Sequence, residues 1–210
     1  MIGVVPWKRC TSPSRQVFAT LLPQIAQDIN AVNQLVVHGF PYQAVAVSVS
    51  AFEHSVMLAS IGKDDARASR WIAHTDPGHN IDSVQRTVQL ALDNLDRDFP
   101  GVKVQLQDPY KGMYQPLCAF KHGNPLVQQY VRQIASSPLP MSMFDTADRR
   151  AIIAAMWAIE AAIRAAWFAL VSFVPHHLPK SPDLEEIVRG FNAGLNAVVA
   201  IRRIKEQQPN

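Results

Sequence analysis

Cysteine, glycine and charged residues are all scarce in this chain of 210 residues. The two cysteines, Cys10 and Cys118, are too few for a disulfide-rich scaffold, and nine glycines leave little material for loops that cradle phosphate groups. Charged residues make up 18% of the chain and the formal net charge is +3, which excludes a strongly charged, disordered protein. The lysines and arginines are scattered, so the clustered basic stripe typical of nucleic-acid-binding proteins is missing.

The sequence also lacks the motifs that identify common enzyme classes. It contains no P-loop, no GxGxxG, no HExxH, no GxSxG, no CxxC and no EF-hand loop. None of the seven histidines forms a metal-ligating pair on one helix face, so we expect neither a metal nor another cofactor. The N-terminal residues lack the apolar core of a signal peptide, which favours a cytoplasmic protein with reduced cysteines.

Apolar residues, by contrast, make up 48% of the chain, and most of them recur at helical spacing. The sequence therefore predicts an all-α protein, a single-domain bundle of six to eight helices over residues 1–210. Proline, glycine and capping residues place the helices at 13–38, 41–61, 64–74, 82–98, 110–122, 125–136, 145–174 and from 182 onward.

Three boundaries in this pattern carry specific expectations. Asn80 or Asp82 is the expected N-cap of the fourth helix. The segment 102–107 alternates between polar and apolar residues but has no obvious partner strand, so we expect an extended connector. The proline-containing loop 136–144 is the candidate internal boundary of the chain.

The most apolar stretch is the long alanine-rich helix expected over 151–174. It is long enough to cross a membrane, but Glu160 and Arg164 lie near its middle, where each charge would cost about 3 kcal/mol, so a buried helix is favoured. The two residues are expected to form a buried ion pair, or else a polar pocket walled by Trp157 and Trp167. A helix that is apolar all round is predicted to be the axis of the bundle or the seam of a homodimer.

A second feature groups polar side chains on the short helix at 110–122. Tyr114, Cys118 and His122 are spaced i, i+4 and i+8, which places a hydroxyl, a thiol and an imidazole on one face. The functional interpretation is a general acid or base, or a histidine that contacts RNA. The structural alternative is that His122 bonds the last carbonyls of the helix while Gly123 takes the left-handed turn.

This segment resembles a bacterial all-helical family of unknown function, whose pattern is Tyr-x-x-Leu-(Ser or Cys)-x-x-x-His-Gly. In that family a similar segment follows an early helix with an acidic residue, which Glu53 matches here. The resemblance covers residues 40–135. The family has no settled activity, so the resemblance implies candidate site residues, namely Glu53, Tyr114 and His122, and no particular reaction.

The helical architecture is also similar to that of the HEPN superfamily of defence and toxin ribonucleases, which are usually dimers. Their signature is an arginine, then a polar residue, then a histidine after four to six intervening positions. Arg67 and His74 are separated by six residues, although Ala68 stands in the polar position. The resemblance implies that Arg67 binds the scissile phosphate and that His74 or His122 transfers the proton without a metal.

These observations support three hypotheses. The first is a non-enzymatic interaction or sensing module that forms a homodimer and has no membrane partner. The second is a HEPN-like, metal-independent ribonuclease in a defence or toxin context, with RNA as its partner. The third is a helical metalloenzyme that uses Glu53, His54 and His122 as ligands.

Overall fold

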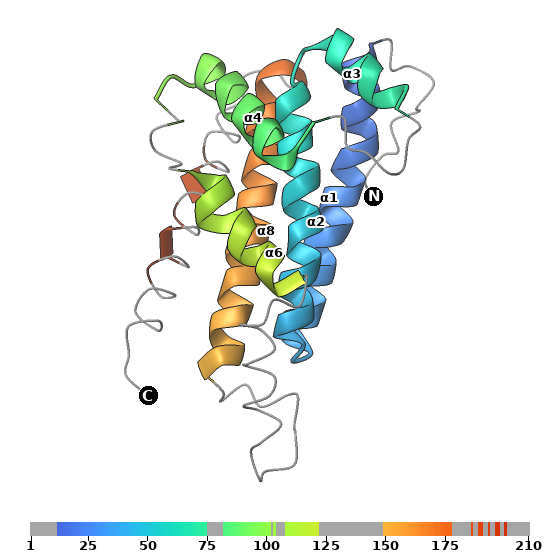
Figure 1. Ribbon diagram of the computed structural model, residues 1–210. Helices are drawn as coiled ribbons and strands as arrows, with labels where there is room; N and C mark the ends of the chain where they lie inside the picture. The colour runs from blue at the N-terminus through green and yellow to red at the C-terminus, as the bar shows by residue number, and fades with distance from the viewer. Residues whose placement is uncertain are drawn as a thin grey trace.

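The computed structural model describes residues 12–74, 82–101, 103, 108–121 and 149–177, together with seven single helical positions between residues 186 and 200. The predicted all-α bundle is confirmed, because these residues form packed helices and no strand. In chain order the elements are α1 (Pro13–Val37), α2 (Pro41–Ile61), α3 (Asp65–Ile72), α4 (Val84–Asp98), the π-helical turn η2 (Tyr110–Tyr114), α6 (Gln115–Lys121) and α8 (Arg149–His177), as Figure 1 shows.

Local signals set the ends of the first three helices, as the sequence predicts. The side chains of Ser12 and Asp64 accept backbone N–H groups at the starts of α1 and α3. Pro41 occupies the first turn of α2, where a backbone N–H has no acceptor within the helix, so proline costs no hydrogen bond there. Gly39 separates α1 from α2 with a φ of 81°, a conformation that residues with a side chain rarely adopt.

The start of α4 differs from the prediction. Its N-cap is Ser83, whose hydroxyl accepts the backbone N–H of Arg86 at 3.2 Å, and neither Asn80 nor Asp82 has this role. The reason is a contact that the local sequence does not reveal. The carboxylate of Asp82 accepts a hydrogen bond of 2.7 Å from the Arg67 guanidinium, so it is engaged elsewhere.

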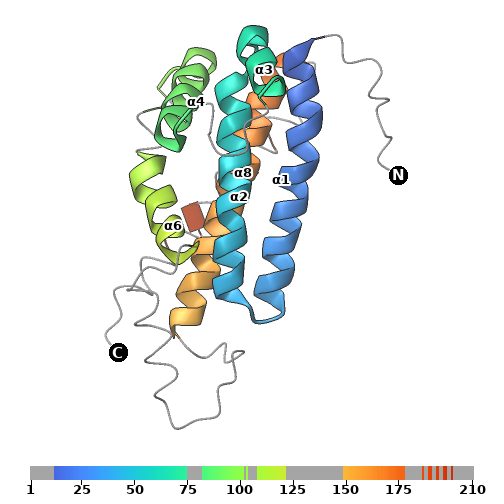
Figure 2. The ribbon, with the colours of Figure 1, turned by 45° about the vertical axis from the view of Figure 1, so that its right-hand side comes forward.

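The axis of the bundle is α2. The helices α1, α3, α4, α6 and α8 all pack against it, and Figure 2 shows it between α1 on one side and α4 and α6 on the other. Its buried residues include many alanines, serines and valines, which allow neighbours on several sides to approach closely. The hydroxyls of Ser48, Ser55 and Ser60 each donate to the carbonyl three residues earlier, so burial leaves them satisfied. The sequence analysis gave two alternatives for the helix at 151–174, the axis of the bundle or the seam of a homodimer. The structure packs this helix against α1, α2 and α4, so it lies beside the axial helix α2, and the seam stays a prediction.

That long helix, α8, packs along one side of α2 and carries two apolar stripes on opposite faces. The inner stripe is buried and consists mainly of small residues: Ala154, Ala158, Ala161, Ala165, Phe168 and Ser172. The outer stripe is only partly buried and is built mainly from larger residues: Ile152, Met156, Ile159, Ile163, Ala166 and Leu170. The face of α8 that packs against α2 is therefore made mostly of alanines, with Phe168 as its large side chain.

The buried side chains form two apolar clusters. The larger one surrounds Phe52 and joins α2 to α4, α6 and α8. The smaller one surrounds Phe18 and joins α1 to parts of α2, α3 and α8. The Phe52 ring meets the edge of Phe168, with the two ring centroids 6.1 Å apart, and this contact anchors the centre of α8 to α2.

Among the residues that the structure describes, two segments are long and apolar enough to cross a membrane by length and composition alone: α2, and Ala151–Ser172 of α8. The sequence analysis tested only the second. In the bundle, 67% of the apolar window of α2 and 44% of that of α8 are buried, and the core helices of other proteins pass the same test. Location therefore stays a prediction.

Several predictions fall on residues that the structure does not describe. These are the helix at 125–136, the loop at 136–144, the helix start at 145, and the side chains of Cys10 and His122. Within the segment 102–107, Lys103 alone is described, and it is helical rather than extended. The single positions between 186 and 200 are helical, in agreement with the last predicted helix.

Candidate functional site

A tyrosine and a glutamate from distant parts of the chain meet between η2 and α2. The hydroxyl of Tyr114 donates a hydrogen bond of 2.7 Å to Oε1 of Glu53, and both side chains are partly exposed. The Tyr114 ring also stacks on the rings of Phe52 and Tyr110, at centroid distances of 5.9 and 5.5 Å. Stacking on two neighbours fixes the direction in which the hydroxyl points.

The wide turn η2 carries Tyr114 to this position. In a π-helix each N–H bonds to the carbonyl five residues earlier, and here the N–H of Gln115 bonds to the carbonyl of Tyr110. Pro116 follows directly. It has no N–H to offer the carbonyl of Gly112, and its ring would clash with that carbonyl in a regular α-helix. The wider turn relieves this clash, so Pro116 accounts for the π-helical geometry.

Cys118 and Lys121 complete the cluster from α6. Cys118 lies one turn beyond Tyr114, and Nζ of Lys121 is 4.0 Å from Oε2 of Glu53. Burial, followed by the hydrogen bonds and charges of Cys118 and Glu53, raises the pKa of Tyr114 well above its usual value. Tyr114 therefore keeps its proton at neutral pH and donates a hydrogen bond to the Glu53 carboxylate. The other oxygen of that carboxylate faces the Lys121 ammonium group.

The structure thus brings together two of the residues that the sequence analysis selected, Glu53 and Tyr114. It does not describe His122, so whether the imidazole joins them stays a prediction. Lys121 was missed. Its spacing of i+7 from Tyr114, on the face that also holds Cys118 at i+4, is the signal that could have identified it.

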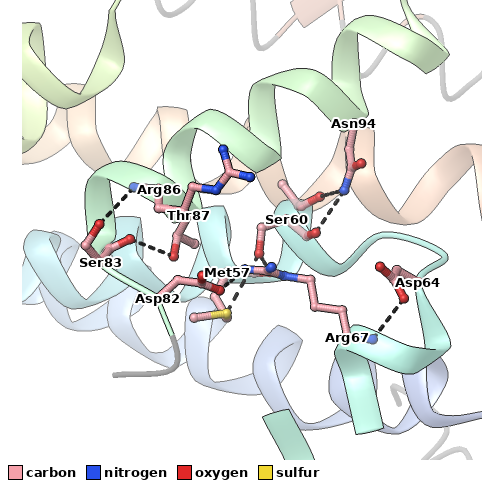
Figure 3. Close-up of polar contacts among 10 residues, drawn as sticks. Met57, Ser60, Asp64, Arg67, Asp82, Ser83, Arg86, Thr87 and Asn94 are labelled. Carbon is pink, nitrogen blue, oxygen red and sulfur yellow. Dashed lines mark hydrogen bonds and ion pairs between the residues drawn. The ribbon is translucent and has the colours of Figure 1, made fainter. Parts of the chain in front are cut away.

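Arg67, the candidate phosphate-binding residue, is committed to an ion pair within the fold. Its Nη2 lies 2.7 Å from Oδ2 of Asp82, a contact that ties α3 to the start of α4 (Figure 3). The residue is 8% exposed, and its Nε has no hydrogen-bond partner among the described residues. His74 lies exposed just beyond the C-terminal end of α3. A buried guanidinium that Asp82 neutralises is poorly placed to bind a substrate phosphate.

His54 and Glu53 are sequence neighbours that contact different helices. Nδ1 of His54 is 3.0 Å from Oδ2 of Asp28 on α1, whereas Glu53 binds Tyr114 on η2. In the part of the chain that the structure describes, no three histidine, cysteine, aspartate or glutamate side chains gather around a point where a metal could bind. His122, the third ligand of the metalloenzyme hypothesis, lies outside the described residues, so that hypothesis stays a prediction.

Glu160 and Arg164 are in contact, at the spacing that the sequence analysis used. Oε1 of Glu160 accepts hydrogen bonds of 3.1 and 3.0 Å from Nε and Nη2 of Arg164. Glu160 is 2% exposed, and Arg164 supplies a counter-charge to its carboxylate in the apolar interior. Arg164 is partly exposed, so the pair runs from the interior towards the surface, and this geometry favours a structural role.

A groove of about 570 Å³ runs along α4 beside the Glu53–Tyr114 cluster. One face of α4, from Ser83 to Leu92, forms one wall, and Lys103, Asp108 and Tyr110 contribute the rest of the described lining. Because Tyr110 also stacks on Tyr114, the groove and the cluster share one aromatic wall.

A comparison of the chain with models of known protein families, with curated proteins and with solved structures finds no match.

Proposed function

We propose that this chain is a helical interaction or sensing module that acts in the cytoplasm as a homodimer, with the outer stripe of α8 as its seam. The observation that carries this proposal is the partial exposure of large apolar residues along that stripe. Large apolar residues that run along one helix face and remain accessible are typical of a surface that binds another helix.

The spacing of the outer stripe supports pairing with a second helix. Its members fall at 152, 156, 159, 163, 166 and 170, which is the alternating four-and-three spacing of a coiled-coil seam. The charged pair of α8 does not interrupt this stripe, because Glu160 is buried on another face. A second copy of the same stripe offers an apolar surface of matching length.

Light scattering after size-exclusion chromatography tests the seam. The wild-type protein is expected to elute as a dimer, and Ile159→Glu is expected to elute as a monomer, because a carboxylate in an apolar seam would lose its hydration without gaining a partner. Val37→Glu is the matched control. Val37 is 71% exposed on α1, so the same kind of substitution there is expected to leave the dimer intact.

Two results would overturn the proposal. One is a wild-type protein that is monomeric at every concentration tested, which would assign the outer stripe to the chain's own C-terminal region. The other is an Ile159→Glu variant that remains dimeric with an unchanged circular dichroism spectrum, which would place the dimer contact elsewhere.

A second candidate function, metal-independent cleavage of RNA, is favoured by the group formed by Glu53, Tyr114 and Lys121. Such cleavage requires a base for the attacking 2′-hydroxyl, an acid for the leaving 5′-oxygen, and a cation near the phosphate. Glu53 would take the proton as the new P–O bond forms, and Tyr114 would supply one as the old bond breaks. Lys121 would then replace the buried Arg67 as the phosphate contact.

RNA cleavage in the presence of EDTA tests this second candidate. If it is correct, Glu53→Gln and Tyr114→Phe each lower the cleavage rate by about 100-fold, the usual contribution of a positioned acid or base. Asp28→Asn is the matched control, since it removes a carboxylate from α1 that contacts His54 and not Tyr114. Folded wild-type protein without activity in EDTA, or two variants as active as the wild type, would contradict it.

A further inference from the structure

The groove along α4 has the size of a small-ligand site and a lining that is partly apolar and partly polar. Its volume of about 570 Å³ falls within the range of ligand pockets in other proteins. Val88 and Leu92 bring apolar surface to it from the core, and both are at least 95% buried, so this part of the lining is fixed. The remaining described lining consists of polar side chains and one aromatic ring.

The charges at the groove cancel one another. The Asp93 carboxylate accepts hydrogen bonds from Nζ of Lys103 at 2.6 Å and from Nε2 of Gln89 at 2.9 Å. It also attracts the Arg86 guanidinium. With Asp108 in the lining, two carboxylates therefore balance the two cations. A ligand with a net charge would leave that charge without a counter-charge, so the balance favours a neutral ligand.

The lining offers both acceptors and donors of hydrogen bonds. Oδ1 of Asp108 accepts two backbone N–H groups of η2, and Oδ2 has no partner among the described residues. Gln89 donates to Asp93, and its carbonyl oxygen is a second acceptor without a described partner. The Ser83 hydroxyl accepts the N–H of Arg86, which leaves its own hydrogen to donate. A hydroxyl group both donates and accepts, so a ligand that carries several hydroxyls matches this set.

Tyr110 gives the groove an aromatic wall. Its ring stacks on Tyr114 at a centroid distance of 5.5 Å and an interplanar angle of 24°, and this contact holds the ring in place. Tyr110 is also part of the groove lining. The face of an aromatic ring is weakly negative and attracts the weakly positive hydrogens bonded to carbon. One face of a sugar ring presents such hydrogens, while its rim carries the hydroxyls.

We propose that this groove binds a neutral hexose, with the ring packed on Tyr110 and its hydroxyls bonded to Asp108, Gln89 and Ser83. Two sources share this chemistry, a free sugar and one unit of an oligosaccharide. The assignment requires neither the dimer nor RNA cleavage, because these residues lie outside the α8 seam and outside the Glu53–Tyr114–Lys121 group.

Saturation-transfer NMR titrations of the full-length protein with glucose, galactose and mannose test the assignment. At least one of the three is expected to bind with a Kd below about 10 mM. Glucuronate and glucosamine add a negative and a positive charge to the same ring. Each is expected to bind about tenfold more weakly than the best neutral hexose, because its charge would have no counter-charge in the groove.

Two variants test the residues. Tyr110→Leu removes the aromatic face and Gln89→Leu removes a hydrogen-bonding amide, so each is expected to weaken hexose binding by about tenfold. Phe99→Leu is the matched control for the first, because Phe99 is a 40% exposed aromatic residue beyond the end of α4. Gln24→Leu, at an exposed position of α1, is the matched control for the second. Both controls are expected to bind as the wild type does.

The outcomes separate the interpretations. The proposal is overturned if none of the three hexoses binds saturably, if glucuronate or glucosamine binds as tightly as the best of them, or if Tyr110→Leu binds as well as Phe99→Leu. With hexose binding established, a trisaccharide of that hexose that binds more tightly identifies an oligosaccharide as the source, whereas equal or weaker binding identifies the free sugar. Thermal unfolding of each variant checks that lost binding does not reflect lost folding.

Discussion

At the scale of single residues, the hydrogen bond between Tyr114 and Glu53 couples folding to the protonation of one tyrosine. The pKa of Tyr114 is raised above its ordinary value of 10.0 by burial, by Cys118 and by Glu53. In the unfolded chain the phenol releases its proton near pH 10, whereas the folded protein retains it. The stabilisation is therefore complete below pH 10 and is lost as the pH rises towards the higher pKa of the folded state.

We accordingly expect Tyr114→Phe to lower the free energy of unfolding by about 1 kcal/mol at pH 7. This is less than the usual contribution of a hydrogen bond to a charged group, because the pair is partly exposed. The difference between variant and wild type should remain constant up to pH 9 and shrink above pH 10. Urea denaturation of both proteins across this range measures the difference. Equal stability at pH 7, or a difference that grows above pH 10, would show that the hydrogen bond does not stabilise the fold.

The sequence analysis selected both residues of this contact as candidate site residues, although it left open whether they meet. Glu53 and Tyr114 entered through a motif and a resemblance, and the structure places them 2.7 Å apart. The ion pair of Arg67 with Asp82 was missed, because it joins residues that no helical spacing relates. Local periodicity describes one helix at a time, so contacts between helices remain hidden until the helices are packed.

At the scale of the helix, the C-terminal end of α2 depends on a side chain from α4. The last four carbonyls of a helix have no N–H partners within it. Those of Leu58 and Ile61 are bonded by backbone N–H groups that follow the helix. Nδ2 of Asn94 donates to the other two, the carbonyls of Ala59 and Ser60, at 3.0 and 2.9 Å (Figure 3). One amide thus completes the end of the central helix and joins it to α4.

Asn94→Ala is therefore expected to lower the free energy of unfolding by about 2 kcal/mol, since it leaves two carbonyls unsatisfied at a partly buried site. Asn94→Asp should cost more, because a carboxylate would face two carbonyl oxygens at the negative end of the helix dipole. Urea denaturation at pH 7 measures both. Gln85→Ala, an exposed substitution on the same helix, should change stability little. An Asn94→Asp variant as stable as the wild type would be incompatible with this role.

The same scale explains which parts of the fold could be predicted. Caps, prolines and glycines act locally, so the ends of α1 and α2 follow from the sequence. Which helix forms the axis of the bundle does not follow from the sequence, because α2 and α8 are both long and apolar. What distinguishes α2 is that its small residues lie on several sides, so that several helices can pack against it. The π-helical turn also escaped prediction, although Pro116 in the middle of a predicted helix was its local cause.

At the scale of the whole molecule, one stripe of α8 packs against the bundle, and the proposed homodimer would use the other. If the partner is a second copy, an antiparallel arrangement opposes Ile159 to Ile163, Met156 to Ala166 and Ile152 to Leu170. Met156 then fills the space beside the small Ala166, and the branched side chains face one another. A parallel arrangement would place Ala166 against Ala166 and open a gap, and it would align the two helix dipoles unfavourably.

Disulfide cross-linking distinguishes the two arrangements in a chain that carries Cys10→Ser and Cys118→Ser. In an antiparallel dimer, Ile159→Cys chains mixed with tagged Ile163→Cys chains should form a mixed disulfide, while each variant alone should cross-link poorly. In the antiparallel arrangement, identical positions of the two chains are offset along the seam by about four residues, or roughly 6 Å. Together with the distance between the two helices, this offset separates the two Cα atoms by more than a disulfide can span. Non-reducing electrophoresis reads the result. Efficient cross-linking of Ile163→Cys by itself would establish a parallel seam.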